Sequence, residues 1–179
     1  IICGLEWQLF DTPRDYIDFK EIYLDTPFNV MYAFSYILAE SGGDCNLLVG
    51  ADDGVKVWIN EELVLEDETI SINSEPNEFT IPIHVKRGLN TLLVKIAQKS
   101  DEFGFFIRII DKDKRSAENN IAFYPVLPEI PTPIPDDFRE GWNDTTPPYF
   151  RFNLVKVDDP APFFDISTYW WAVDSSEPE

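Results

Sequence analysis

Residues 47–65, LLVGADDGVKVWINEELVL, decide the fold that this sequence predicts. The stretch holds three short apolar runs, which are separated by an Asp-Asp-Gly turn and an Asn-Glu-Glu turn. In the middle run the apolar side chains fall on alternate positions, as on one face of a β-strand: Val55, Val57 and Ile59. Lys56 and Trp58 then face the opposite way. The stretch therefore predicts a β-meander with one buried face.

The turn at residues 52–54 has the composition of a tight bend. Asp52 and Asp53 can hydrogen-bond the local backbone, and Gly54 is expected to take the positive φ because it has no Cβ. The two aspartates are also candidate calcium ligands, since hard cations bind carboxylate and carbonyl oxygens in tight loops. The simpler interpretation is that both carboxylates shape the turn and stay solvated, and the sequence leaves the two interpretations open.

The same alternation continues along the first 110 residues. Residues 29–39 carry apolar side chains on both faces, which favours a strand in the interior of a sandwich. Residues 79–85 alternate as well, and Pro82 predicts an edge strand because proline cannot donate to a ladder. Residues 90–97 and 105–110 complete the set. About eight or nine short strands without an amphipathic helix predict an all-β fold, an antiparallel β-sandwich of the jelly-roll kind.

The chain is strongly acidic, with 14 Lys+Arg against 33 Asp+Glu and a formal net charge of -19. A nucleic-acid partner is not expected, because phosphate binding requires a basic surface. No apolar run approaches the roughly 18 residues that cross a bilayer, so we expect no membrane insertion. The chain starts at Ile1 inside an apolar run, and we interpret it as a piece of a longer or processed protein.

Three residues are candidates for covalent modification. Cys3 and Cys45 lie in separate predicted strands. A disulfide between them and two buried free thiols are both compatible with the sequence, because pairing cannot be deduced from spacing. Asn143 begins an Asn-Asp-Thr triplet, which is an N-glycosylation acceptor and is expected on a surface loop.

The composition changes in the last third of the chain. Ten of the 14 prolines lie in residues 121–179, and the run PVLPEIPTPIPDD is stiff and extended. We therefore expect a β-sandwich at 1–120, a Pro-rich linker at 121–143 and a separate β segment at 144–179. Two strand-like runs cannot bury a core alone. The last segment therefore begins a domain that continues beyond the chain, or pairs with something else.

Catalysis has little support in the sequence. The one histidine, His84, falls on the polar face of the predicted edge strand. Neither a Cys/His cluster for zinc nor a glycine-rich phosphate loop occurs. Carboxylates are so numerous that pairs of them arise by chance and do not by themselves indicate a catalytic site. We therefore expect a protein that is not an enzyme.

Several motifs in order resemble the galactose-binding-like jelly-roll modules of secreted bacterial and archaeal proteins. They are ICG near the start, VMYAFSYI, GADDGVKVWIN, VKRGLNTLLVKIAQ and GFFIRI, and together they cover about residues 1–112. One departure is Asn60-Glu61, where the family usually has Asn-Gly, so we expect a wider turn than a two-residue type I′ hairpin. The resemblance implies a non-catalytic carbohydrate-binding or carbohydrate-enzyme accessory module, extracellular or at the cell surface.

Two further resemblances concern shorter motifs. The Asp-Asp-Gly turn is similar to that of the protective-antigen-type domains of yeast flocculins and bacterial adhesins. In the sugar-binding members of that family adjacent aspartates hold a calcium ion, which implies a calcium role for Asp52 and Asp53. The segment 144–179 is similar to the opening of bacterial immunoglobulin-like domains, on the motifs DTTPP and WAVD.

Two functions follow as alternatives. In the first, Trp58 reaches solvent beside Lys56 and stacks on a sugar ring, so that the partner is a glycan. Trp58 has no ligand role if residues 66–77 or a neighbouring domain cover it. In the second function the chain is a structural or adhesive module of a surface layer, stalk or filament, with neighbouring protein subunits as partners. A concave, solvent-open site with an aromatic floor favours the first, and burial of the same face by a neighbouring subunit favours the second.

Overall fold

The computed structural model describes eight parts of the chain, namely residues 7–12, 14, 16–21, 29–68, 75–98, 103–112, 121–124 and 150–157. These residues form eleven β-strands and one short 3-10 turn, and they contain no α-helix. The strands are β1 (Gln8–Thr12), β2 (Tyr16–Asp18), β3 (Asn29–Ala39), β4 (Gly43–Ala51), β5 (Gly54–Ile59), β6 (Glu62–Asp67), β7 (Phe79–Val85), β8 (Gly88–Gln98), β9 (Gly104–Asp111), β10 (Ile121–Tyr124) and β11 (Phe150–Val157), and the 3-10 turn is η1 (Phe19–Glu21).

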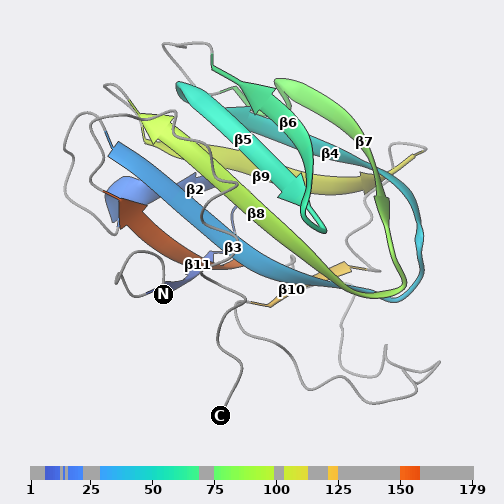
Figure 1. Ribbon diagram of the computed structural model, residues 1–179. Helices are drawn as coiled ribbons and strands as arrows, with labels where there is room; N and C mark the ends of the chain where they lie inside the picture. Colours follow the sequence, from blue (N-terminus) through green and yellow to red (C-terminus); the bar gives the residue numbers. More distant parts are fainter. Residues whose placement is uncertain are drawn as a thin grey trace.

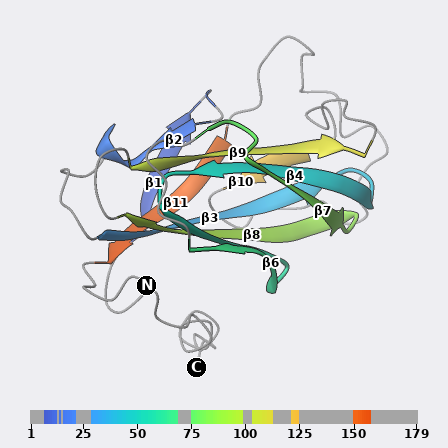
Figure 2. The same ribbon diagram turned by 90° about the horizontal axis from the view of Figure 1, so that it is seen from above.

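The strands belong to two antiparallel sheets that face each other (Figures 1 and 2). The larger sheet has the order β1-β11-β3-β8-β5-β6, and β10 also pairs with β3. The smaller sheet has the order β2-β9-β4-β7. The prediction of an all-β antiparallel sandwich is therefore confirmed. Within the described parts of the chain, no helix has the length and apolar character needed to span a bilayer.

The core lies between the two sheets and is built from alternate residues of each strand. In β5 the three predicted core residues, Val55, Val57 and Ile59, are all buried. They belong to one cluster with residues of the smaller sheet, among them Leu47, Val49, Phe105 and Ile107. Side chains of a pleated strand alternate between its two faces, so the period-2 pattern correctly identified the core side of β5.

The long strand β3 lies in the middle of the larger sheet and is buried on both faces. It pairs along its whole length with β8. On its other edge β11 pairs with the first half of β3, and β10 pairs with the second half. The prediction of an interior strand at 29–39 is confirmed. The edge position that Pro82 predicts is confirmed as well, since β7 is the last strand of the smaller sheet.

The central stretch is not the continuous meander that the sequence predicts. β5 and β6 are neighbours in the larger sheet, but β4 belongs to the smaller one. The turn at Asp52 and Asp53 therefore carries the chain from one sheet to the other. Asp53 has a φ of 58°, and Gly88 is the one described glycine with positive φ, so the expectation for Gly54 is wrong. Aspartate tolerates the left-handed region because its short side chain can hydrogen-bond locally.

The turn between β5 and β6 also differs from expectation. Ile59 pairs with Glu62, so only Asn60 and Glu61 form the loop. Their φ angles are 49° and 70°, the positive pair that a type I′ turn requires. The expected wider turn is therefore wrong. The reason is that Asn60 is fixed from outside the turn: its N–H donates to the Thr91 carbonyl at 3.0 Å, and its Oδ1 accepts from the Thr91 N–H at 3.1 Å.

Two strands of the larger sheet come from residues that the sequence analysis placed outside the sandwich at 1–120. Ile121–Tyr124, expected as the start of the linker, form β10 on β3. Phe150–Val157, expected in the segment 144–179, form β11 between β1 and β3. The structure therefore shows that β11 pairs with strands of the sandwich itself. This pairing closes an edge of β3 that would otherwise be open and apolar. The remaining residues of 144–179 lie outside the described part of the chain, and the immunoglobulin-like segment stays a prediction.

Candidate functional site

The outer face of the larger sheet, on the side away from the core, carries a second apolar cluster. It consists of Val30, Tyr32, Trp58, Leu93 and Ala97, and Trp7 and Phe34 pack against it. We call these seven residues the outer cluster. They come from β3, β5 and β8, where they alternate with core residues, and from Trp7 just before β1. The larger sheet is therefore apolar on both of its faces.

Trp58 is the centre of the ligand-binding expectation, and the structure places it in the outer cluster. It lies opposite Leu93 of β8 and Leu63 of β6. It faces away from Val55, Val57 and Ile59, as the alternation predicts. Its residual exposure is 8%, whereas Leu63 beside it is 44% exposed. The indole is therefore not an aromatic floor that is open to a sugar ring.

A row of charged and aromatic side chains crosses the same face. The register places Tyr32, Lys95 and Lys56 side by side on β3, β8 and β5. The Lys95 Nζ lies 5.9 Å from the centroid of the Tyr32 ring, which is within the range of a cation–π contact. Lys95 is only 3% exposed. Sequence reasoning missed Lys95, although a lysine between Leu93 and Ala97 on the apolar outer side was a visible signal.

Lys56, the second residue of the ligand-binding expectation, is engaged in ion pairs. Its Nζ lies 2.5 Å from Glu66 Oε1 and 3.8 Å from Glu68 Oε1. Both glutamates belong to the chain around β6, next to β5 in the sheet. Lys56 and Lys95 together place two positive charges on the outer face of a molecule whose net charge is -19.

Asp52 and Asp53 are buried, at 1% and 6% exposure, so the interpretation of solvated turn carboxylates is wrong. Glu78 lies close to this turn. Burial raises the pKa of Glu78, and the carboxylates of Asp67 and Glu75 raise it further. Among the described residues, no group of three or more His, Cys, Asp or Glu side chains could hold a metal ion. Calcium at Asp52 and Asp53 therefore stays a prediction from the sequence.

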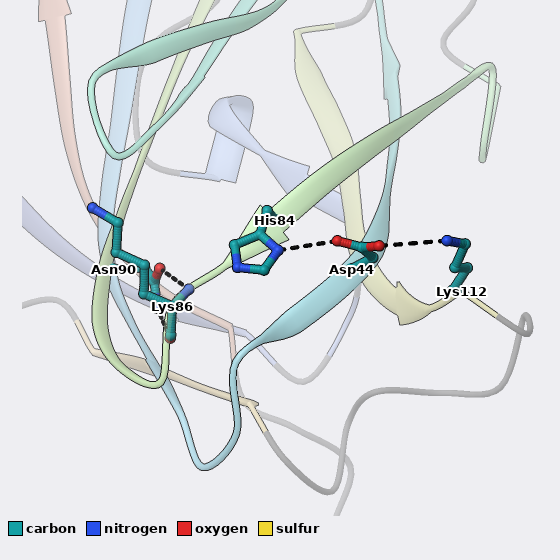
Figure 3. A network of polar contacts seen from close by, with 5 residues as sticks. All are labelled: Asp44, His84, Lys86, Asn90 and Lys112. Carbon is teal, nitrogen blue, oxygen red and sulfur yellow. Dashed lines mark hydrogen bonds and ion pairs between the residues drawn. The ribbon is translucent and has the colours of Figure 1, made fainter.

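The smaller sheet carries a polar network on its exposed outer side (Figure 3). His84 Nδ1 and Asp44 Oδ1 are 3.0 Å apart, and the Lys112 Nζ lies 3.4 Å from Asp44 Oδ2. The hydrogen bond from His84 is the main reason that the pKa of Asp44 lies below its usual range, and Lys112 lowers it further. All three side chains are exposed, and exposed ion pairs contribute little to stability. His84 lies on the polar face of the edge strand, as expected.

Asn90 is a structural residue that sequence reasoning missed. It is buried, and its Oδ1 accepts the N–H of Lys86 at 2.8 Å, while its Nδ2 donates to the Lys86 carbonyl (Figure 3). The Nδ2 also donates to the Gly88 carbonyl at 3.1 Å. The Asn60 Nδ2 also donates to Asn90 Oδ1 at 2.9 Å. Asn90 therefore holds the β7–β8 connection and links it to the β5–β6 turn.

Cys45 is a free, half-buried thiol. Burial is the main cause that raises the pKa of this thiol, and the nearby carboxylates of Asp111 and Asp44 add to the effect. Cys45 therefore stays protonated at neutral pH and is a poor nucleophile. Cys3 and Asn143 lie outside the described residues.

No protein-family model, no curated protein and no solved structure matches this chain. Its function is therefore inferred from the two sheets, the outer cluster and the charges around them.

Proposed function

We propose that this chain is a non-catalytic β-sandwich module with a structural or adhesive role, in which the outer cluster is a packing surface. The observation that carries this proposal is that Trp58 is only 8% exposed within the single chain, so its indole is not presented to a ligand. A site for a small ligand presents its aromatic side chains to an open concave surface. A sheet that is apolar and buried on both faces is typical of a layer packed between two others.

The remaining parts of the proposal follow from the sequence. The sandwich is of the jelly-roll kind and resembles galactose-binding-like modules, and its two antiparallel sheets support this at the level of a sandwich. A secreted, multidomain protein at the cell surface is the setting in which such modules occur. The absence of a catalytic role is supported by the exposed position of His84 and Asp44 and by the protonated thiol of Cys45.

Glycan binding is the second candidate function, and one observation on the smaller sheet favours it. Tyr16 and Phe106 are half-buried on its outer side, and their ring centroids are 4.6 Å apart. Arg108 lies two residues further along β9, on the same face. Partly exposed rings next to a guanidinium group can stack on a sugar ring and hydrogen-bond its hydroxyls. A calcium ion at Asp52 and Asp53 belongs to this candidate.

Thermal unfolding of Trp58→Ala tests the packing surface. We expect a loss of about 3–5 kcal/mol, because removing a buried tryptophan leaves a large cavity. Leu63→Ala is the matched control on the neighbouring strand, and it should cost less than about 1 kcal/mol because Leu63 is 44% exposed.

A panel of immobilised glycans separates the two candidates. If Trp58→Ala abolishes retention on a glycan and leaves the melting temperature unchanged, the outer cluster is a ligand site and the packing proposal is wrong. Retention that is lost in Phe106→Ser, with the melting temperature preserved, would instead support glycan binding on the smaller sheet.

A further inference from the structure

We infer that copies of this chain associate edge to edge, with β6 of one copy pairing antiparallel to β1 of the next. The larger sheet then continues from copy to copy. This inference rests on the proposed function, because it names the partner of the structural module as a second copy of the same chain.

The two terminal strands of the larger sheet carry exposed apolar side chains. Among the described residues, the large hydrophobic side chains that are exposed are Leu9 at 63% and Leu63 at 44%. Leu9 belongs to β1 and Leu63 to β6, the first and the last strand in the order of the sheet. No described strand pairs with the outer edge of either one. Both leucines are therefore open to a partner.

These two edges lack the residues that usually keep an edge strand from pairing. Lysine and proline on an edge prevent further strand addition, and Pro82 does so on β7 of the smaller sheet. β1 and β6 contain neither residue, and no residue of β6 is buried. The bulge of β6 at Val64 leaves Glu62 and Leu63 in regular pairing with β5. Both edges are therefore able to accept another strand.

The register places both exposed leucines in one row across the outer face of the larger sheet. From β1 to β6 the paired residues of this row are Leu9, Asn153, Phe34, Leu93, Trp58 and Leu63. Leu9 and Leu63 are the two ends of the row. When the row continues into a second copy, Leu63 of one copy therefore lies beside Leu9 of the next.

The strand directions allow the sheet to continue in this way. All five pairings along the order β1-β11-β3-β8-β5-β6 are antiparallel, so β1 and β6 run in opposite directions. A second copy placed beside β6 in the same orientation therefore presents its β1 antiparallel to that strand. Leu63 and Leu9 become cross-strand neighbours, and such apolar pairs stabilise an antiparallel sheet.

The charges of the two edges favour pairing of β6 with β1 over pairing of two like edges. β6 has three acidic residues among six, Glu62, Glu66 and Asp67, whereas β1 has one among five. Two β6 strands would bring their acids together, and like charges that lie opposite each other destabilise a sheet. Two β1 strands would leave Leu63 uncovered. A contact between β6 and β1 covers both leucines, and it can repeat because each copy keeps one free edge of each kind.

Sedimentation velocity of the full chain tests the association. At about 0.1 M sodium chloride we expect the mean mass to rise with protein concentration, in a series that reaches about 1 mM, the range of weak contacts. At about 0.01 M the rise should be smaller, because the charge of -19 on each copy repels over a longer distance. A chain that keeps its monomer mass of 20.7 kDa throughout the series at the higher salt concentration contradicts the inference.

A mixture of two edge variants identifies which strands pair. Leu9→Lys blocks β1 and leaves β6 intact, and Leu63→Lys does the reverse. Each variant alone should associate about tenfold more weakly than the unmodified chain, or less. An equal mixture should form a dimer with one copy of each variant, and it should stop there because the two remaining edges are both blocked.

Ser41→Lys is the matched control. It makes the same charge change at an exposed position between β3 and β4, so it should associate as the unmodified chain does. If either lysine variant loses the β-sheet signal in circular dichroism, Leu9→Ser and Leu63→Ser replace the pair. Dimers of Leu63→Lys alone indicate β1 with β1, dimers of Leu9→Lys alone indicate β6 with β6, and either result overturns the inference.

Failure of this inference is distinct from failure of the proposed function. If the chain stays monomeric and Trp58→Ala strongly destabilises it, the outer cluster is still a packing surface and only the edge-to-edge contact is wrong. If Trp58→Ala leaves the melting temperature unchanged, the proposed function fails whatever the sedimentation shows.

Discussion

At the scale of single residues, the tight turns depend on side chains that accept unusual backbone angles. Asp53, Asn60, Glu61 and Asn77 all have positive φ. Aspartate and asparagine adopt this region comparatively easily, because a short polar side chain can hydrogen-bond the local backbone. Glu61 has no such advantage. It is held there because Asn60 is anchored to Thr91 and Asn90, so the turn keeps its form despite the strain at Glu61.

Replacing Glu61 by glycine should therefore stabilise the protein. The left-handed conformation costs an L-residue about 1–2 kcal/mol, and glycine avoids this cost. Glycine also has greater freedom in the unfolded chain, which lowers the stability of the folded protein by about 0.5–1 kcal/mol and offsets part of the gain. We expect Glu61→Gly to raise the free energy of unfolding in urea by about 0.5–1 kcal/mol. Glu62→Gly, at the first position of β6, is the control and should lower it. A destabilised Glu61→Gly would show that the glutamate side chain has a stabilising contact.

At the scale of elements, glycines mark where backbones approach closely. A Cβ placed on Gly50 of β4 would lie 1.9 Å from the carbonyl oxygen of Glu75. A Cβ on Gly104 of β9 would lie 2.4 Å from the carbonyl oxygen of Ile17 in β2. In both places the obstacle is main chain, which cannot rotate away as a side chain can. These two strands of the smaller sheet therefore accept only glycine at these positions.

Gly50→Ala should consequently destabilise the sandwich by about 2 kcal/mol or more, because relief requires a backbone shift. Gly43→Ala lies on the same strand, where an added Cβ meets nothing within 4 Å, and it should change stability by less than about 0.5 kcal/mol. Chemical denaturation of the two variants measures the difference. Equal effects at the two positions would mean that the segment at Glu75 does not pack on β4.

At the scale of the whole molecule, the excess of acidic residues acts on every part of the fold. The formal net charge is -19, and like charges repel more in the compact state than in the expanded one. Salt weakens this repulsion, since the Debye length falls from about 30 Å at 0.01 M to about 10 Å at 0.1 M. The acidic surface therefore lowers stability most at low ionic strength.

Raising sodium chloride from about 0.01 M to about 0.1 M at pH 7 should raise the melting temperature. The same titration near the isoelectric point of about 4.2 is the control, and there the salt effect should largely disappear. A melting temperature at pH 7 that falls with added salt would show that specific ion pairs, such as Lys56 with Glu66, outweigh the general repulsion.

The sequence by itself determined where most strands lie and which side of β5 faces the core. Val55, Val57 and Ile59 were identified by alternation alone, and Pro82 marked an edge, because both signals arise from the local geometry of one strand. The tertiary structure decided that β4 and β5 belong to different sheets and that β11 lies between β1 and β3. It also decided that Trp58, Asp52 and Asp53 are buried. Pairing joins segments as distant as Phe34 and Asn153, and burial depends on what lies opposite a side chain, so neither is encoded in a local pattern.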